Sequence, residues 1–238
     1  MSLIQTITNT CFVKPHPAGL PFIGGGLVAS IILMLVFKPL GVFALLLTLF
    51  VYYFFRDPVR AVPQDKNLVL SPADGRVIAI SSNNILPDDL IEEDDSKTYT
   101  KISIFLSVLD AHVNRVPFGG EVIKTFYYEG KFFNAELDKA SKENERAHAL
   151  IKTDSGKLIA FSQIAGLVAR RIITDLKDGD VIKAGHRFGL IRFGSRMDVY
   201  LPDNTPVLVC EGQTAIAGET ILADFSNADK KSLTAEKI

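Results

Sequence analysis

Residues 18–55 read AGLPFIGGGLVASIILMLVFKPLGVFALLLTLFVYYFF, and Lys38 is the only charged residue among these 38. The 183 residues from Arg56 onward hold 51 of the chain's 53 Lys, Arg, Asp and Glu residues, a density typical of a soluble domain. The mean hydropathy of +0.22 therefore reflects one apolar segment. We predict a membrane anchor in residues 1–60, joined to one globular domain in residues 61–238.

The apolar stretch is predicted to form a helical hairpin that turns at Lys38-Pro39. It splits there into runs of 20 and 16 residues, whereas a helix that spans a bilayer needs about 20. Pro21 and the Gly24-Gly25-Gly26 triplet are expected to restrict the first helix to roughly residues 27–37. The hairpin is compatible with crossing the membrane twice and with dipping into one leaflet. A cleaved signal peptide is disfavoured, because the segment is long and ends without a small-residue cleavage site.

Basic residues flank the hairpin on one side of the membrane, with Lys14 before it and Arg56 and Arg60 after it. Cytoplasmic loops carry an excess of such residues, so the globular domain is expected on the cytoplasmic side of the cell membrane. The aromatic residues 52–55 suit the level of the lipid headgroups. The net charge of -1 and the 47% hydrophobic composition argue against intrinsic disorder and against a nucleic-acid partner.

The globular domain is predicted to be β-rich α+β, built as a sandwich or partly closed barrel. One helix is expected around residues 136–146. Short runs rich in β-branched residues, separated by Gly, Pro and Asp, predict strands at residues 68–70, 76–80, 101–106, 120–125, 158–164, 198–201 and 206–210.

An internal similarity suggests a more specific architecture. Residues 178–191 (DGDVIKAGHRFGLI) and 211–223 (EGQTAIAGETILA) share an acidic residue followed by Gly, and an Ala-Gly pair five residues later. Together with residues 71–77 (SPADGRV), they resemble the turns of a barrel-sandwich hybrid, the lipoyl-like fold of carrier domains. A carrier domain would present a modifiable lysine between the frames, and residues 192–202 contain none.

Cysteines and acidic residues give no sign of a disulfide framework or a metal site. Cys11 and Cys210 lie far apart, which fits two free thiols. Residues 88–95 are rich in Asp and Glu but lack the ligand spacing of a calcium loop, so no bound metal is expected.

Gly194-Ser195 is a dipeptide with distinctive potential chemistry. A serine hydroxyl that follows glycine can attack the glycine carbonyl, which shifts the chain from an amide to an ester. Loss of the serine α-proton then breaks the chain, and hydrolysis leaves a pyruvoyl group at the new terminus. Gly-Ser pairs are also common in turns, so the dipeptide alone leaves both interpretations open.

Six ordered blocks between His16 and Asp224 resemble the phosphatidylserine decarboxylase family, in its short, membrane-anchored branch. The blocks are residues 54–58 (FFRDP), 71–77 (SPADGRV), 105–117 (FLSVLDAHVNRVP), 144–146 (NER), 163–172 (QIAGLVARRI) and 192–202 (RFGSRMDVYLP).

The resemblance implies a zymogen that cuts itself between Gly194 and Ser195. It would yield chains of residues 1–194 and 195–238 that stay together as a heterodimer, and it is compatible with assembly of several such heterodimers into a homo-oligomer. The cofactor would be a pyruvoyl group derived from Ser195, which forms a Schiff base with the substrate amine and accepts the electrons left by CO2. Membrane phosphatidylserine would become phosphatidylethanolamine in phospholipid biosynthesis.

The resemblance also implies an Asp-His-Ser arrangement for self-cleavage. Asp74 matches the acid, and its alternative role is that of an ordinary turn residue before Gly75. A longer bacterial branch has two histidines in a His-x-x-His block, of which the second serves as base; here His112 matches the first and Arg115 stands at the second. His112 is the predicted base, because imidazole titrates near neutral pH.

The remaining site residues are less specific. His148 and His186 are the alternative bases. Arg170 and Arg171, after the Gly166 turn, are candidates to bind the substrate phosphate or carboxylate, or form a solvated charge pair. Two other functions stay open: a pyruvoyl decarboxylase of a soluble amino acid, which leaves the anchor without a use, and a non-enzymatic, membrane-tethered lipoyl-like adaptor, which would remain uncut.

Overall fold

The computed structural model describes residues 13–90, 97–131, 143–166, 171–192 and 195–226. These residues form two compact units. The first comprises the described residues up to Val59 together with Leu109–Val113, and the second comprises the described residues from Arg60 to Val108 and from Asn114 onward.

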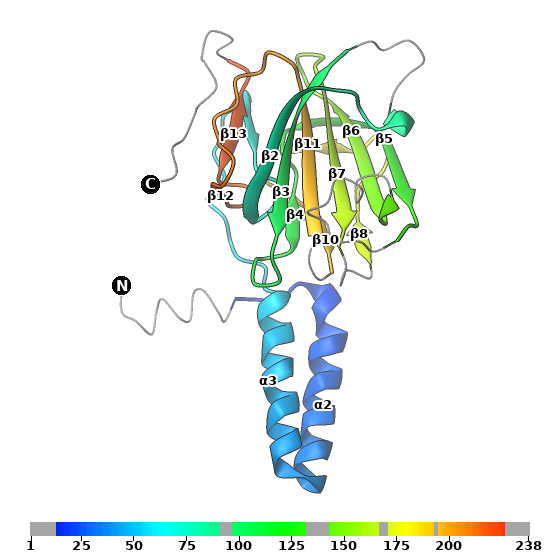
Figure 1. Cartoon of the computed structure of the whole chain (residues 1–238), viewed down its shortest axis with the longest axis vertical. Helices are drawn as coiled ribbons and strands as arrows, with labels where there is room; N and C mark the ends of the chain where they lie inside the picture. Colours follow the sequence, from blue (N-terminus) through cyan, green and yellow to red (C-terminus); the bar gives the residue numbers. More distant parts are fainter. Residues whose placement is uncertain (1–12, 91–96, 132–142, 167–170, 193–194, 227–238) are drawn as a thin grey trace, which may run out of the picture. The chain divides into compact units, whose positions relative to one another are not determined.

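The first unit contains an antiparallel helix pair, as the hairpin prediction required. A 3-10 turn, η1 (Pro17–Gly19), leads into α2 (Leu20–Val36), and α3 (Lys38–Phe54) runs back beside it (Figure 1). Extended backbone at Phe37 makes the turn, and Pro39 lies in the first turn of α3, where a missing N–H breaks no helical bond. The Phe55 carbonyl accepts from His16 N–H at 2.7 Å, so both ends of the hairpin are tied together.

The expected late start of the first helix is wrong. Pro21 occupies the first turn of α2, and the glycine triplet is helical throughout. Glycine weakens helices largely because it exposes the backbone to water and is flexible when unfolded, whereas an apolar medium leaves the backbone no partner outside the helix. Gly26 also lets the helices approach, because a Cβ atom there would lie 2.5 Å from Thr48 Oγ1.

Small residues hold α2 and α3 at close range. A Cβ atom at Gly41 would lie 2.4 Å from the backbone nitrogen of Met34. Ser30 and Thr48 are buried between the helices, with their hydroxyl oxygens 3.4 Å apart. Each helix has 17 residues and is therefore about 25 Å long. Pro17–Val36 is long and apolar enough to cross a membrane.

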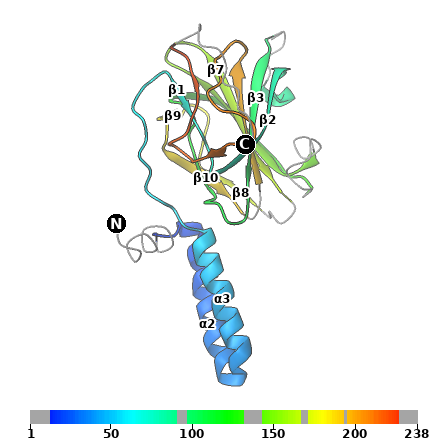
Figure 2. The ribbon, with the colours of Figure 1, turned by 60° about the vertical axis from the view of Figure 1, so that its left-hand side comes forward.

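The second unit is dominated by a curled antiparallel sheet of eight strands, in which β9 and β2 lie on opposite sides of the domain (Figure 2). Their order is β12 (Thr214–Ala215), β2 (Gly75–Asn84), β3 (Tyr99–Leu106), β11 (Ser195–Pro202), β7 (Leu158–Ala165), β6 (Arg146–Lys152), β5 (Gly120–Tyr128) and β9 (Val181–Ile182). The other strands are β4 (Val113–Arg115), β10 (Arg187–Ile191) and β8 (Ile172–Thr174) in one sheet, and β1 (Leu68–Leu70) and β13 (Ile221–Asp224) in another, with a 3-10 turn, η2 (Asp88–Leu90), between β2 and β3.

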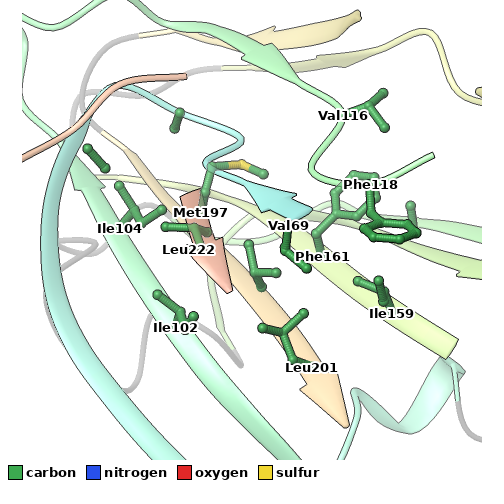
Figure 3. Packing of buried hydrophobic residues seen from close by; sticks show 14 of the residues in the cluster. Val69, Ile102, Ile104, Val116, Phe118, Ile159, Phe161, Met197, Leu201 and Leu222 are labelled. Atoms are coloured by element: carbon green, nitrogen blue, oxygen red, sulfur yellow. The ribbon is translucent and has the colours of Figure 1, made fainter. Parts of the chain in front are cut away.

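One hydrophobic core joins the three sheets. Ile104 and Met197 of the large sheet pack in the same cluster as Val69 of β1, Leu222 of β13 and Phe188 of β10, and Figure 3 shows much of this packing. The β-rich class is therefore confirmed. The strand predicted at residues 206–210 is wrong: only an isolated bridge from Val207 to Ala223 occurs there, since Pro206 cannot donate to a ladder.

The predicted helix around residues 136–146 cannot be compared over most of its length, because residues 132–142 lie outside the described residues. Its last residue, Arg146, begins strand β6 instead. Residues 147–151 are all buried, which is the pattern of an interior strand.

The two similar frames have equivalent structures. In each frame the two glycines adopt positive φ, at Gly179 and Gly185 in one and at Gly212 and Gly218 in the other. The backbone hydrogen bonds also correspond, from Gly179 N to Val122 O, Gly212 N to Val77 O, Gly185 N to Val116 O and Gly218 N to Ser71 O. Each frame contributes one terminal strand of the large sheet, β9 or β12.

Candidate active site

Ser195 begins the central strand of the large sheet. β11 lies between β3 and β7, and Ser195 pairs with Leu106 on one side and with Ala165 on the other. The Ser195 side chain is fully buried, and its Oγ atom has no hydrogen-bond partner among the described residues. Gly194 lies outside the described residues.

Strand register brings Asp74 to the same end of the sheet. Arg76 of β2 and Arg196 of β11 both pair with Phe105 of the strand between them. Asp74 precedes Arg76 by two residues and Ser195 precedes Arg196 by one, so both lie beyond these partners at one sheet end. β2, which follows Asp74, and β11, which begins at Ser195, are two strand spacings apart, a distance of about 10 Å.

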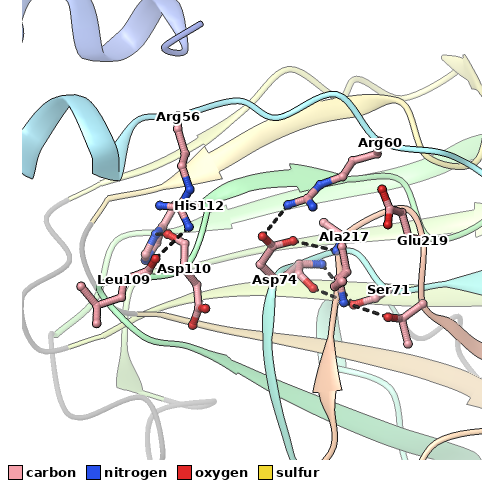
Figure 4. Close-up of polar contacts among 12 residues, drawn as sticks. Arg56, Arg60, Ser71, Asp74, Leu109, Asp110, His112, Ala217 and Glu219 are labelled. Atoms are coloured by element: carbon pink, nitrogen blue, oxygen red, sulfur yellow. Dashed lines mark hydrogen bonds and ion pairs between the residues drawn. The ribbon is translucent and has the colours of Figure 1, made fainter. Parts of the chain in front are cut away.

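The Asp74 carboxylate is held by two groups of the second unit (Figure 4). Oδ2 accepts a 2.5 Å hydrogen bond from Arg60 Nη2, and Oδ1 accepts from the backbone N–H of Ala217 at 2.8 Å. Gly75 shapes the turn, because its φ of +152° and its approach to the Phe105 carbonyl leave no space for a Cβ atom. Asp74 is thus a charge-paired residue in a constrained turn.

His112 belongs to the first unit, where it packs on the end of α3. Its ring lies 4.1 Å from the ring of Phe54, measured between centroids. Burial lowers the pKa of His112 to about 4, against the opposing effect of its hydrogen bond to the Asp110 backbone. Because a carbonyl only accepts, the 2.9 Å contact between Nδ1 and Asp110 O places the proton on Nδ1. Nε2 therefore carries the lone pair that a general base needs.

His148 lies on the other face of the large sheet from Ser195. It pairs with Ser162, which pairs with Asp198, and side chains in register share a face. Asp198 is three residues from Ser195, so their side chains point to opposite faces. His148 Nδ1 lies 2.6 Å from Ser162 Oγ, and burial lowers the pKa of His148 to about 4. This geometry does not favour His148 as a base for Ser195.

His186 lies in the turn before β10 rather than in a strand, and it is exposed. Its backbone carbonyl accepts from Val116 N–H at 2.8 Å. Arg115, at the position of the family's second histidine, is buried and donates from Nη1 to the Gly185 carbonyl at 2.8 Å. Arg115 therefore anchors the turn that carries His186.

The predicted substrate-binding residues fall at different places. Gly166 is buried directly after Ala165, the residue that pairs with Ser195. Arg171 is exposed just before β8, and its carbonyl accepts from Arg192 N–H at 3.1 Å. Arg170 lies outside the described residues. In the described part of the chain, no three His, Cys, Asp or Glu side chains cluster as metal ligands would.

Asn144 and Glu145, for which the sequence predicted no role, are buried at the Ser195 end of the sheet. Asn144 Nδ2 donates to the Ala165 carbonyl at 2.6 Å, and Ala165 N–H donates to the Glu145 carbonyl at 2.9 Å. Glu145 Oε1 accepts from Ile172 N–H and from the Tyr127 hydroxyl. Burial and this carboxylate raise the pKa of Tyr127 to about 12. The polar triplet Asn144-Glu145-Arg146, at the start of a buried strand, was the sequence signal that could have indicated these residues.

Comparison with known proteins identifies the family of the chain. Residues 47–223 match the family model described as phosphatidylserine decarboxylase. The phosphatidylserine decarboxylase proenzyme of Nitrobacter winogradskyi is 50% identical over 217 residues, which cover 91% of this chain and 87% of that protein. The chain belongs to the phosphatidylserine decarboxylase family. It is therefore an enzyme, a decarboxylase of phospholipid metabolism.

Proposed function

We propose that the chain cuts itself between Gly194 and Ser195 and then converts phosphatidylserine to phosphatidylethanolamine and CO2, using a pyruvoyl group derived from Ser195. The buried Ser195 Oγ, which has no hydrogen-bond partner among the described residues, carries this proposal. A buried hydroxyl without a partner costs about 1–3 kcal/mol, so its presence calls for a functional reason. An unsolvated hydroxyl at the start of a rigid strand is suited to act as a nucleophile.

Self-cleavage would begin when a base removes the Ser195 hydroxyl proton. A bond forms between Oγ and the Gly194 carbonyl carbon, and the peptide C–N bond breaks as the nitrogen takes up the proton from the base, which gives an ester and a free Ser195 amine. Loss of the Ser195 α-proton then breaks the Cβ–Oγ bond and releases residues 1–194 with a carboxylate end. Water replaces the nitrogen of the resulting dehydroalanine as ammonia, which leaves the pyruvoyl group on residues 195–238.

His112 is our proposed base, and Asp74 the acid that supports it. The neutral imidazole has its proton on Nδ1, which bonds Asp110 O, so the lone pair that a base uses is on Nε2. His112 follows Leu106, the pairing partner of Ser195, by six residues, and a chain of that length spans at most roughly 20 Å. Asp74 lies at the Ser195 end of the sheet.

The finished group would supply an electron-accepting carbonyl for the pair left by departing CO2. It would be held covalently at the start of β11, between the partners Leu106 and Ala165. Gly166, without a side chain, would leave space beside it for the serine headgroup. Arg171, with Arg170, would bind the substrate phosphate or carboxylate, because guanidinium groups recognise both.

We further propose that residues 1–60 anchor the enzyme in the cell membrane, with residues 61–238 forming the catalytic domain on the cytoplasmic side. The apolar helix pair and the flanking Lys14 and Arg56 support this topology. The two equivalent glycine frames support a relationship of the β domain to the lipoyl-like barrel-sandwich folds. Phospholipid biosynthesis is the pathway that the proposed products serve.

Intact-mass measurement of the purified protein tests the self-cleavage. We expect two chains, the shorter without a free amino terminus, and a single uncut chain in Ser195→Ala. Full decarboxylase activity in Ser195→Ala would refute the pyruvoyl proposal. Such activity would require a different electron acceptor.

A histidine comparison tests the base. His112→Ala should abolish self-cleavage, whereas His148→Ala, whose histidine is similarly buried on the opposite sheet face, should cut normally. Because the pKa of His112 is lowered to about 4, the self-cleavage rate should stay constant from pH 8 to about 5 and fall as the imidazole becomes protonated near pH 4. Normal cutting by His112→Ala would eliminate His112 as the base.

A further inference from the structure

Leu109 is an exposed apolar residue within the first unit. Its side chain retains 59% of its accessible surface. The segment Leu109–Val113 follows β3 in the chain, yet it groups with the helix pair. In Figure 4 the Leu109 side chain points away from the ring of His112. Leu109 therefore presents an exposed apolar surface at this place in the first unit.

Arg56 fixes the position of Leu109 relative to α3. Its Nη2 donates to the Leu109 carbonyl at 2.8 Å, and its Nη1 donates to the Tyr53 carbonyl at 3.0 Å. The same guanidinium lies over the Tyr53 ring, 3.9 Å from its centroid. Arg56 is only 9% exposed, so this bridge is an internal structural contact. Leu109 is therefore tied to the last turn of α3.

The last turn of α3 indicates the depth of this contact. Tyr52 and Tyr53 end a run of apolar residues whose side chains are largely exposed. Tyrosines at the end of a membrane helix lie at the level of the lipid headgroups, where the ring is apolar and the hydroxyl is wet. Because one guanidinium bonds both Tyr53 and Leu109, the two residues share this level.

We propose that Leu109 inserts into the headgroup and acyl boundary of a phospholipid bilayer, as a second membrane contact beside the helix pair. The Arg56 bridge gives it the depth of the α3 end, and its exposed apolar side chain gives it the chemistry. The contact also holds His112, three residues later and in contact with the Phe54 ring, at headgroup level. The depth assigned to Leu109 and the headgroup level of His112 both rest on the membrane anchor proposed above.

Tryptophan fluorescence can test the insertion directly, because the chain contains no tryptophan. The full-length variants are Leu109→Trp, Val36→Trp at the end of α2 as a bilayer control, and Val181→Trp on β9 as an exposed control in the second unit. Val36 and Val181 are 80% and 83% exposed. Each is reconstituted in phosphatidylcholine and phosphatidylglycerol vesicles, with and without bromine on the acyl chains near the headgroup.

We expect emission from Leu109→Trp and Val36→Trp to shift to shorter wavelength in vesicles and to be quenched by the brominated lipid. Emission from Val181→Trp should do neither. A blue shift of Leu109→Trp without quenching would show that the side chain packs on protein and would overturn the proposal. Equal quenching of Leu109→Trp and Val181→Trp would also overturn it, since the contact would then be unspecific.

A kinetic comparison separates membrane contact from chemistry. Leu109→Asp should raise KM for phosphatidylserine in vesicles severalfold, with kcat unchanged and with unchanged kinetics on a short-chain, water-soluble phosphatidylserine. Val181→Asp should alter neither. An unchanged vesicle KM in Leu109→Asp would contradict the inference. If the wild-type protein does not decarboxylate phosphatidylserine, the proposed function fails, while the quenching result still decides the membrane contact.

Discussion

Replacing Arg196 alone should destabilise the second unit more than removing its whole ion pair. Arg196 and Asp198 are 2% and 0% exposed and lie on one face of β11. Nε lies 2.8 Å from Oδ1, and Nη2 donates to Oδ2 at 2.9 Å. Arg196→Met leaves a buried carboxylate without its cation, which costs about 3–5 kcal/mol. Replacing both residues by apolar ones removes that penalty and should cost at least about 2 kcal/mol less.

Thermal unfolding in detergent, followed by circular dichroism, measures this difference. All variants carry Ser195→Ala, so that every chain remains whole under the proposed mechanism. For a unit of this size about 1 kcal/mol corresponds to roughly 2–4 °C, so Arg196→Met should lower Tm by roughly 6–20 °C. The double variant with Asp198→Leu should recover much of the loss. An equal Tm for the single and double variants would refute the reasoning.

An exposed ion pair provides the matched control for this experiment. Lys131 Nζ lies 3.1 Å from Glu143 Oε2, with side chains 69% and 43% exposed. Water screens such a pair, so Lys131→Met should change stability by no more than about 0.5 kcal/mol. A loss as large as that of Arg196→Met would mean that burial does not set the cost.

Two further predictions concern the helix pair and the Asp74 turn. Gly41→Val should destabilise the helix pair by about 1–3 kcal/mol, because its side chain would push α3 away from the α2 backbone. The measurement is the loss of helical circular dichroism on heating in micelles, which should occur at a lower temperature. Gly24→Val, whose Cβ would have no atom within 4 Å, should leave this temperature unchanged. Arg60→Gln should slow self-cleavage about tenfold, since Asp74 loses a charge-assisted hydrogen bond worth roughly 1.5 kcal/mol. Glu219→Ala removes the hydrogen bond that holds the neighbouring residue, Ala61, through its N–H, and this variant should cut at the wild-type rate. Equal slowing by both variants would assign the effect to the position of the backbone at residues 60–61 rather than to the charge on Asp74.

The sequence was most informative where one physical property dominates. The apolar composition of residues 18–55 and the Lys38-Pro39 break were sufficient to predict the helix pair. β-branched runs located most strands of the large sheet. The start of α2 was misjudged because glycine propensities measured in water do not carry over to an apolar environment. Residues 206–210 were misjudged because Pro206 cannot donate to a ladder, and the segment forms only an isolated bridge to β13.

The contacts of the site depend on register and packing, which local patterns do not encode. Asp74 was predicted from its turn, but its partner Arg60 comes from the segment that follows α3. Glu145, directly before β6, meets the backbone of Ile172 in β8, 27 residues away, because β8 packs beside β6. His112 was chosen for its chemistry, yet no periodicity indicates that five residues of a β-rich segment group with the helices.

Under the proposed cut, strand pairing rather than the peptide bond would hold the new terminus in place. Residues 195–226, the described part of the shorter chain, contribute three strands, and each of them pairs with a strand of residues 1–194. β11 pairs with β3 at eight positions and with β7 at six, while β12 joins β2 and β13 joins β1. Breaking the chain before Ser195 removes none of these ladders. A covalent cofactor at the end of β11 would therefore keep the position that the uncut serine already occupies, so the zymogen fold itself would position the later chemistry.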